Sequence, residues 1–510
     1  MLKKIAIGFL VLLLAGAAAL AWVAHNASRL VRERGIKMLE DRFESQVEIQ
    51  DLRVALFPSV SLEGSWLVLR HHGRTDVPPL IVIKQFRTHE SWLVLLGRPW
   101  HLQSVQLHGL SIHIPPRTSG AKPQTQPRKG LGIPVQVDEL TSDDTELEII
   151  PNDPGKRSHI FAIHRLTMHS VGLGRSAPFQ VALTNDTPPG EINAQGQFGP
   201  WNRDDPRETP LSASYTFDHA DLGVFRGIAG TLSSEGKFGG ILEKIEVEGE
   251  TTVPDFEVRI SGHPVLLKTK FSATVDGTNG NTFLHPVIAS FGHSSLTCNG
   301  EVVKATKGKG REILLNVVAS NARLEDLLTL AVKGAKPLMT GWVNLKTRFD
   351  LPPGKEEVTE KLRLKGQFGI GHGQFTSEEI RGKIEGLSRR GQGKPDDEDA
   401  GSAVTQLAGR FALKEGLITL SGLTFHVTGA TVQLDGSYAL QDEAMDFHGK
   451  LRLDARLSQM TTGFKSFLLK PFDPFFRKHG ETELPIKITG TRTRSSFGLD
   501  FHRKKSIAQR

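Results

Sequence analysis

The sequence predicts a mainly β protein with an N-terminal transmembrane helix, antiparallel strands and a few short helices. Three observations predict it. Twenty apolar or small residues stand together at 5–24. Beyond them, apolar and polar residues alternate with a period of two in many short runs, which is typical of half-buried strands. The 52 glycines and 27 prolines predict many turns, which numerous strands need more than long helices do.

The apolar stretch from Ile5 to Ala24 follows Lys3 and Lys4 and contains no charged residue. Twenty residues at 1.5 Å each give about 30 Å, the thickness of a bilayer's hydrocarbon core. A cleaved signal peptide has a shorter apolar region, of about 7–15 residues, although the small residues at 17–19 would fit a cleavage site. Length therefore favours an uncleaved single-pass anchor. Lys3 and Lys4 favour residues 1–24 as cytoplasmic N-terminus and span, whereas the basic residues after the span argue for the opposite orientation: Arg29, Arg32, Arg34, Lys37 and Arg42.

Residues 25–46 predict a helical stalk that continues out of the bilayer. The segment carries basic residues on a mixed face, among them Arg34 and Lys37. These side chains either lie near lipid phosphates or belong to a solvated stalk, and the sequence leaves both interpretations open.

The rest of the chain divides by its patterning into an N-terminal β segment (47–114), a flexible Pro-rich loop (115–130), a central β segment (131–360) and a C-terminal β segment (361–505). Strands are expected, among other places, at 147–150, 256–260, 271–275, 313–318, 342–349, 411–420 and 430–440. Residues 445–457, MDFHGKLRLDARL, alternate throughout and predict one strand of roughly 43 Å. Apolar residues at helical spacing predict short helices in ARLEDLLTLAVKG and TSEEIRGKIEGLSRR.

Charge and motifs argue against catalysis and nucleic-acid binding. The 63 basic and 56 acidic residues are interleaved, so no basic tract is typical of a nucleic-acid surface. No Walker, HExxH or GxSxG motif occurs, and GIGHG at 369–373 is expected to be a turn between strands. His71 and His72 are adjacent and should face opposite sides of a strand, so a shared metal is not expected. We therefore expect a protein that is not an enzyme, with no catalytic residue, metal or cofactor.

Several stretches together resemble one family. They are the anchor, VEIQDLRVALFPSVSLEG, SWLVLLGRPWHLQSVQLHGLSIHI, FSATVDGTNGNTFLHPV, GRFALKEGLITLSGLTFHVTGATVQLDGSYAL and LPIKITGTRTRSSFGLDF. In this order they resemble the AsmA-like proteins of Gram-negative envelopes, which are related to TamB and similar to the bridge-like lipid transfer proteins. The resemblance implies an elongated, curved sheet that forms an open groove (a β-taco), anchored in the inner membrane with the bulk of the chain in the periplasm. It further implies that phospholipid is held or conducted between the envelope membranes in support of outer-membrane biogenesis.

A groove of this kind needs an apolar lining. The candidates are the apolar residues of the C-terminal alternating runs: Phe425, Val427, Val432, Leu434, Met445, Phe447, Leu451, Leu453, Leu457, Ile486, Ile488, Leu499 and Phe501. Two facing sheets would hide such residues equally well, so periodicity alone also allows a tandem of β-sandwiches. Some of these side chains could also pack under a helix.

Residues 461–480 combine aromatic and basic side chains. Apolar rings with basic flanks suit a membrane interface, and the candidates are Lys465, Phe467, Lys470, Phe472, Phe475 and Phe476. A helix and turn that plugs one mouth of the sheet is the alternative.

Three functions follow as hypotheses. The first is a groove for phospholipid. The second is a TamB-like assembly factor whose sheet edge receives a strand of an outer-membrane barrel protein. The third is a non-catalytic envelope scaffold. The expected partners are accordingly phospholipids, the inner membrane and an outer-membrane barrel protein, without nucleic acid.

Overall fold

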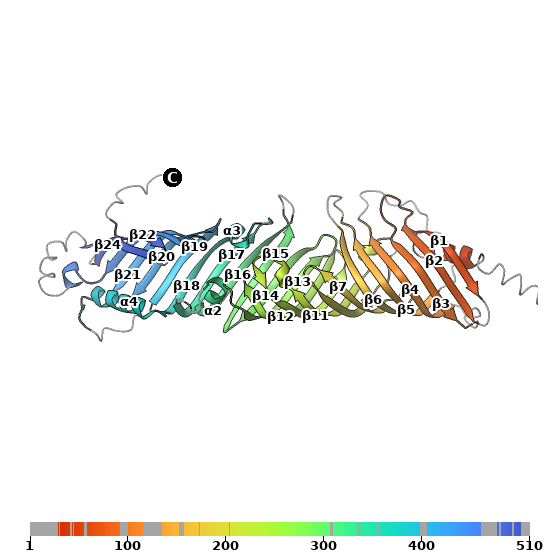
Figure 1. The fold of residues 1–510 in the computed structure, drawn as a ribbon, viewed down its shortest axis with the longest axis horizontal. Helices are drawn as coiled ribbons and strands as arrows, with labels where there is room; N and C mark the ends of the chain where they lie inside the picture. Colours follow the sequence, from red (N-terminus) through yellow and green to blue (C-terminus); the bar gives the residue numbers. More distant parts are fainter. Residues whose placement is uncertain are drawn as a thin grey trace, which may run out of the picture. The chain divides into compact units, whose positions relative to one another are not determined.

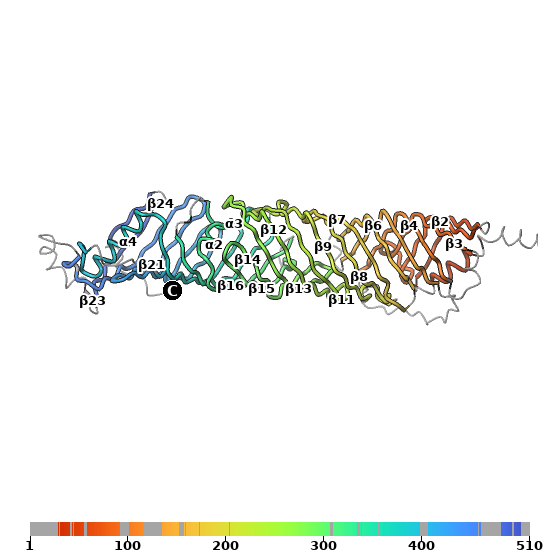
Figure 2. Tube along the Cα trace, turned by 90° about the horizontal axis from the view of Figure 1, so that it is seen from below, coloured from red at the N-terminus to blue at the C-terminus, as the bar shows by residue number. Residues whose placement is uncertain are grey.

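The computed structural model describes residues 29, 31–40, 43, 45–55, 59–91, 100–116, 135–151, 158–172, 174–202, 204–305, 310–333, 337, 339–354, 356–397, 405–460, 477–478, 481–491 and 494–500. Hydrogen bonds join the strands of these residues into one sheet of 25 strands, most of which pair with their neighbours in sequence (Figure 1). The prediction of a mainly β fold is confirmed. In both ribbon and tube the strands are bent and tilted, so that the sheet curves (Figures 1 and 2).

The strands up to residue 276 are β1 (Ser45–Ala55), β2 (Val60–His71), β3 (Ile81–Glu90), β4 (Trp100–Ile114), β5 (Val135–Ile149), β6 (His159–Val171), β7 (Ala177–Asp186), β8 (Pro189–Phe198), β9 (Leu211–Asp221), β10 (Ile228–Ala229), β11 (Thr231–Ile241), β12 (Lys244–Val258) and β13 (Val265–Asp276). The later strands are β14 (Asn281–Phe291), β15 (Ser294–Lys304), β16 (Arg311–Arg323), β17 (Met339–Leu351), β18 (Arg363–Phe375), β19 (Thr405–Lys414), β20 (Leu417–Val427), β21 (Ala430–Ala439), β22 (Ala444–Leu453), β23 (Arg477–Lys478), β24 (Glu481–Thr491) and β25 (Arg494–Leu499).

Helices are few, as predicted. Among the described residues, the α-helices are the N-terminal helix at residues 31–40, α2 (Leu324–Ala331), α3 (Val358–Lys361) and α4 (Glu378–Gly391). The side chain of Ser377 caps α4 by accepting a hydrogen bond from the backbone N–H of Ile380, and acidic residues occupy its first turn and basic residues its last. The two helices expected from periodicity are therefore confirmed as α2 and α4.

One pair of strands departs from the expected antiparallel pattern. β4 and β5 pair in parallel, with Trp100 opposite Val135 and Ile114 opposite Ile149. Parallel neighbours cannot be joined by a tight turn and need a crossover of a dozen or more residues. The long connection between β4 and β5, in which the Pro-rich segment 115–130 lies, meets this need.

Three local predictions are wrong at turns. The alternation of 445–457 continues past the end of β22 at Leu453, where the N–H groups of Asp454 and Ala455 donate to the carbonyls of Gly429 and Gly391 instead of to a strand. The expected strand 411–420 is a hairpin, because Glu415 and Gly416 take positive φ angles of 54° and 72° and form its two-residue turn. GIGHG at 369–373 lies inside β18, at an irregularity of the ladder next to His372.

The chain divides into two compact units. One takes the residues up to Ala220 with Ser233–Gly249 and Thr274–Gly280, and the other takes Asp221–Leu232, Glu250–Ala273 and the residues from Asn281 onward. They are called unit 1 and unit 2 below, and each is described by itself.

Unit 1 has its hydrophobic core on one face of β1 to β9. A row of directly opposite residues crosses the sheet through Val47, Leu69, Ile81, Ile112, Leu147 and Phe161. Within the predicted stalk, Ile36, Leu39 and Phe43 pack against the buried cluster of β1 and β2. The ring of Phe43 also meets Trp201 edge-on, with centroids 6.0 Å apart. The apolar side of this helix thus covers part of the sheet.

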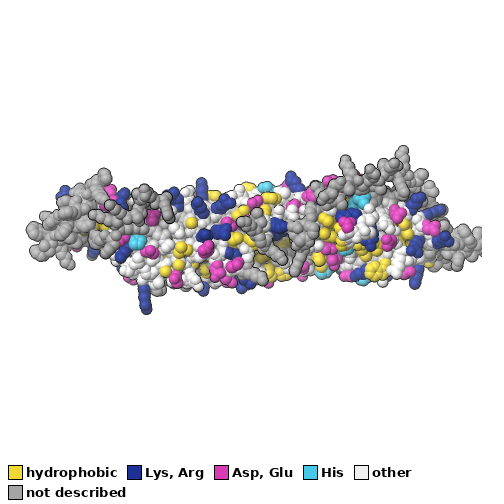
Figure 3. Space-filling model, turned by 90° about the horizontal axis from the view of Figure 1, so that it is seen from above, with side chains coloured by type: hydrophobic (Ala, Val, Ile, Leu, Met, Phe, Trp, Pro, Cys, Tyr) yellow, Lys and Arg dark blue, Asp and Glu magenta, His cyan; other side chains and the backbone are white. Residues whose placement is uncertain are grey.

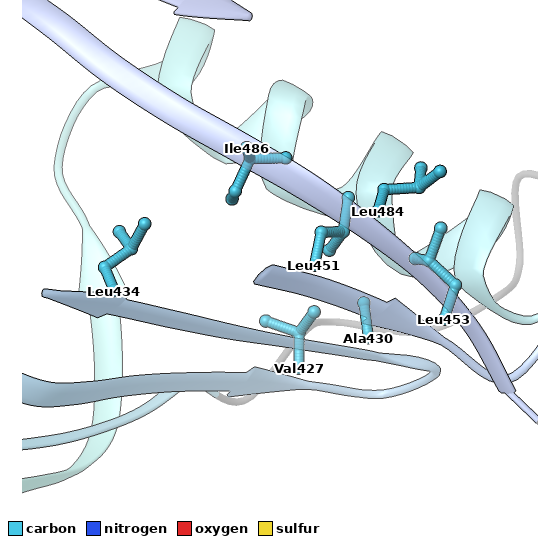
Figure 4. Close-up of a cluster of buried hydrophobic side chains, with 7 residues drawn as sticks. All are labelled: Val427, Ala430, Leu434, Leu451, Leu453, Leu484 and Ile486. Carbon is cyan, nitrogen blue, oxygen red and sulfur yellow. The ribbon is translucent and has the colours of Figure 1, made fainter. Parts of the chain in front are cut away.

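Unit 2 carries α2 and α4 against one face of its sheet. Leu327 and Leu328 of α2 pack on a cluster that includes Val343 and Ile370, and Ile384 and Leu387 of α4 pack on a second cluster. Figure 4 shows the second cluster, whose side chains come from neighbouring strands with the helix alongside. Of residues 29–500, with the gaps given above, no helix is both long and apolar enough to span a membrane. The predicted span at 5–24 lies outside the described residues.

Candidate functional site

One face of the unit 2 sheet is apolar along many strands. Strand register places a continuous cross-strand row on β14 to β22: Val287, Cys298, Val317, Thr347, Gly366, Phe411, Leu420, Gly436 and Phe447. A second row beside it runs through Ala289, Leu296, Ala319, Leu345, Phe368 and Gly409. The ladder between β19 and β20 is irregular at Gly409, which lies next to Leu423, and from Leu423 the row continues through Leu434 and Gly449. We call the surface that these rows occupy the apolar face, and the opposite surface the polar face.

Side chains of the apolar face are more buried than those of the polar face, and their burial also varies along the apolar face. The side chains of Val317, Phe411 and Phe447 are half-buried, whereas their strand neighbours Asn316 and Arg410 on the polar face are exposed. In a closed sandwich, inward-facing residues would be fully buried like any core residue. Fully buried apolar residues instead gather near α2 and α4. Between these helices the apolar face is only partly covered.

Glycines let neighbouring strands approach closely on this face. A Cβ atom at Gly449 would overlap the carbonyl oxygen of Gln433, and one at Gly436 would overlap the carbonyl oxygen of Asp446. At both positions φ lies outside the left-handed region, so it is space that requires glycine there. Glycine in a strand interior marks a bend or a close approach of another backbone, and here it accompanies the curvature of the sheet.

The structure divides the predicted lining residues into two groups. Val427, Leu453 and Ile486 are at most 1% exposed, and Leu434 and Leu451 are 7% exposed, all five in the cluster beside α4. Phe425, Val432, Phe447 and Ile488 are partly buried against that cluster, Met445 is half-buried, and Leu499 is 46% exposed. The side chain of Leu457 and the whole of Phe501 lie outside the described residues. The first five are therefore core under a helix, and the accessible part of the apolar face lies on earlier strands.

Sequence reasoning missed these earlier residues. Val317, Leu345 and Phe411 each lie in a predicted strand. The sequence of one strand does not indicate which residues of the neighbouring strands lie opposite its own, so the cross-strand rows could not be predicted. The signal that could have found them is the alternation of WVNLKTRF, because aligning this strand in register with the apolar run ILLNVV would have placed their inward side chains in one row. The membrane-interface candidates Lys465, Phe467, Lys470, Phe472, Phe475 and Phe476 all lie outside the described residues.

Little on the apolar face can ionise. Cys298 stands in the first row between Val287 and Val317, half-buried, and burial raises the pKa of its thiol. Ion pairs gather on polar surfaces, for example between Lys450 and Glu483 at 3.0 Å. Figure 3 shows one side of the molecule, on which hydrophobic side chains lie in patches between charged ones. The apolar face therefore offers contact area without fixed charges.

Two adjacent histidines, His71 and His72, stand at the end of β2 in unit 1. The rings of His71 and His72 lie 3.9 Å apart, so the expectation that they face opposite sides is wrong. β2 ends at His71, and His72 takes a φ of 50° in the following turn, which returns its ring to its neighbour. Within the described part of the chain, no three His, Cys, Asp or Glu residues are placed to hold a metal ion.

Comparison with models of protein families, with curated proteins and with solved structures gives no significant match to this chain.

Proposed function

We propose that the chain holds or conducts phospholipid by receiving acyl chains on the apolar face, as an inner-membrane-anchored periplasmic protein that supports outer-membrane biogenesis. The observation that supports this most is the partial burial of the two apolar rows between α2 and α4. The inner-membrane anchor and the periplasmic location in this proposal rest on the resemblance to the AsmA-like family.

The energetics favour such a ligand. Removing an acyl chain from water stabilises it by about 0.8 kcal/mol per CH₂ group, so a sixteen-carbon chain gains roughly 10 kcal/mol in apolar surroundings. A charged headgroup loses far more on burial and must stay in water. A sheet that is apolar on one face and only partly covered satisfies both requirements.

The lining also suits movement. From β14 to β22 the rows cross nine strands, which at about 4.8 Å between strands is roughly 40 Å. Residues of the first row such as Val317, Phe411 and Phe447 offer no polar anchor at which an acyl chain would stop. Binding energy is therefore spread along the row instead of concentrated in one site.

Consecutive valines provide a matched test. Val317 and Val318 both lie in β16, but Val317 is half-buried on the apolar face, whereas Val318 is 36% exposed on the polar face. The test compares the full chain with the variants Val317→Asp and Val318→Asp, each purified in mild detergent. Native mass spectrometry and lipid extraction would measure the phospholipid bound to each protein. We expect phospholipid with the full chain and Val318→Asp, and about tenfold less with Val317→Asp at unchanged circular dichroism. A lipid-free wild type, or equal loss in both variants, would contradict the proposal.

An exposed sheet edge favours a second candidate, the assembly factor. Among the described residues, β25 pairs with β24 on one side alone, and its Phe497 is 65% exposed. An edge of this kind can receive a strand of another protein. Cross-linking from a photoreactive residue at Ser496 to an outer-membrane barrel protein would support it, and cross-links to lipid alone would count against it.

A further inference from the structure

The polar face of unit 2 contains a depression of about 630 Å³ that the lipid proposal does not use. It spans β16 to β20 and is lined by the polar-face residues Ser320, Asn344, Lys346, Gln367, Gly369, Ala408, Arg410 and Gly422. Between them it also touches Ala319, Leu345, Phe368 and Gly409, which are members of the second apolar row. Several polar-face positions in it have a short side chain or none. At Gly369, a Cβ atom would meet no other atom within 4 Å. At these positions the backbone of the sheet is therefore not covered by side chains.

Two cations border this depression in one cross-strand row. Lys346 lies directly opposite Gln367, and Gln367 lies directly opposite Arg410. With strands about 4.8 Å apart, the backbones of Lys346 and Arg410 are roughly 10 Å apart, which their side chains can bridge over Gln367. All three residues are exposed, and no described carboxylate lies within ion-pair distance of Lys346 or Arg410. Both charges are thus available to a ligand.

The uncharged groups beside them mostly donate hydrogen bonds. The side-chain oxygen of Asn344 accepts a hydrogen bond from the backbone N–H of Asn321 at 3.0 Å, which leaves the amide N–H₂ group to donate. Gln367 and Ser320 add an amide and a hydroxyl. The carboxylate of Asp435 is engaged at the rim, where it accepts a hydrogen bond from the N–H of Gly422 at 2.7 Å.

We infer that this depression binds a phosphate-bearing group. Lysine, arginine and neutral donors around one space are the combination that recognises phosphate oxygens, with arginine able to donate two parallel bonds. The volume lies within the range of pockets for small ligands, about 300–1,000 Å³. The group would belong either to a soluble phosphorylated molecule or to a lipid headgroup, and both present the same chemistry.

The test uses the full chain in neutral detergent micelles and isothermal titration calorimetry. One arm titrates sn-glycerol 3-phosphate with glycerol as blank, and the other titrates micelles doped with phosphatidylglycerol against undoped micelles. The site variant is Lys346→Gln with Arg410→Gln. The control is Arg348→Gln with Lys365→Gln, which removes two exposed cations from β17 and β18 outside the depression. A third variant, Gly369→Val, fills the open space without changing charge.

We expect saturable binding that weakens at least about tenfold in the site variant and in Gly369→Val, but not in the control. Binding of glycerol phosphate would identify a soluble ligand, and binding of the doped micelle alone would identify a headgroup. No binding in either arm, or equal weakening in the site variant and the control, would overturn the inference. The site variants replace Lys346, Gln367's neighbour Arg410, or Gly369, and none of these belongs to either apolar row, so these outcomes are independent of the lipid test.

Discussion

The imidazole rings of His71 and His72 contact each other at the end of β2, with centroids 3.9 Å apart and an interplanar angle of 47°. His71 is 8% exposed, and its Nδ1 has no hydrogen-bond partner among the residues that the structure describes. Burial, and secondarily the neighbouring His72, lower the pKa of His71 from 6.5 to about 4. The buried ring is therefore neutral at pH 7.

A pH dependence of stability follows from this shift. The unfolded chain takes up a proton at His71 as the pH falls below 6.5, but the folded chain does so only near 4. The stability that the neutral His71 contributes is therefore fully present above pH 6.5 and decreases as the pH falls from 6.5 to 4. Between about pH 7 and pH 5 we expect a loss of roughly 2 kcal/mol in the free energy of unfolding. Urea unfolding followed by tryptophan fluorescence would measure it. His71→Gln should flatten this part of the pH profile, and substitution of the exposed His89 should not; equal profiles in all three proteins would exclude the effect.

Gly449 should not tolerate a methyl group. Gly449→Ala would place its Cβ against the carbonyl oxygen of Gln433 on the adjacent strand, and we expect a destabilisation of about 1–3 kcal/mol. Gly371→Ala is the matched control, because a Cβ there meets nothing within 4 Å. The urea midpoint would fall for the first variant alone. Similar midpoints would mean that the strands can separate at this point without cost.

Helix α4 should control how much of the apolar face is accessible. Ile384→Asp with Leu387→Asp would place charges in the contact with the cluster that contains Val427 and Leu453. We expect the helix to detach and binding of a hydrophobic fluorescent dye to rise severalfold, since those core residues become exposed. Lys383→Asp changes the exposed side of α4 and should leave dye binding unchanged. If the double variant binds no more dye, α4 does not cover this cluster in solution.

Cys298 can report on occupancy of the apolar face. It is the single cysteine of the chain, half-buried, and burial raises the pKa of its thiol, so reaction with a charged methanethiosulfonate should be slow near pH 7.5. Added phospholipid should slow it further, about threefold or more. In Cys298→Ser with Thr297→Cys the thiol moves to the exposed polar-face position, where lipid should have no effect. Equal rates with and without lipid at Cys298 would argue against occupancy of this row.

The sequence alone predicted which stretches are strands and which are helices, because both properties are local. Alternation such as that of WVNLKTRF requires only that one face of a strand differs from the other, and the spacing around Ile380, Ile384 and Leu387 requires only one helix. The errors of the prediction from sequence were local too. The turn at Glu415 and Gly416 was missed because alternation ran across it, and β22 was extended past Leu453 for the same reason.

What the sequence determined is thus the mainly β character, the few helices and the existence of an apolar face. The tertiary structure decided the rest: which residues of that face are core beside α4, that β4 and β5 run in parallel, and that Lys346 and Arg410 flank one glutamine. These depend on strand register and on where a helix returns to the sheet. Both join residues far apart in the chain, and no single stretch of sequence contains that information.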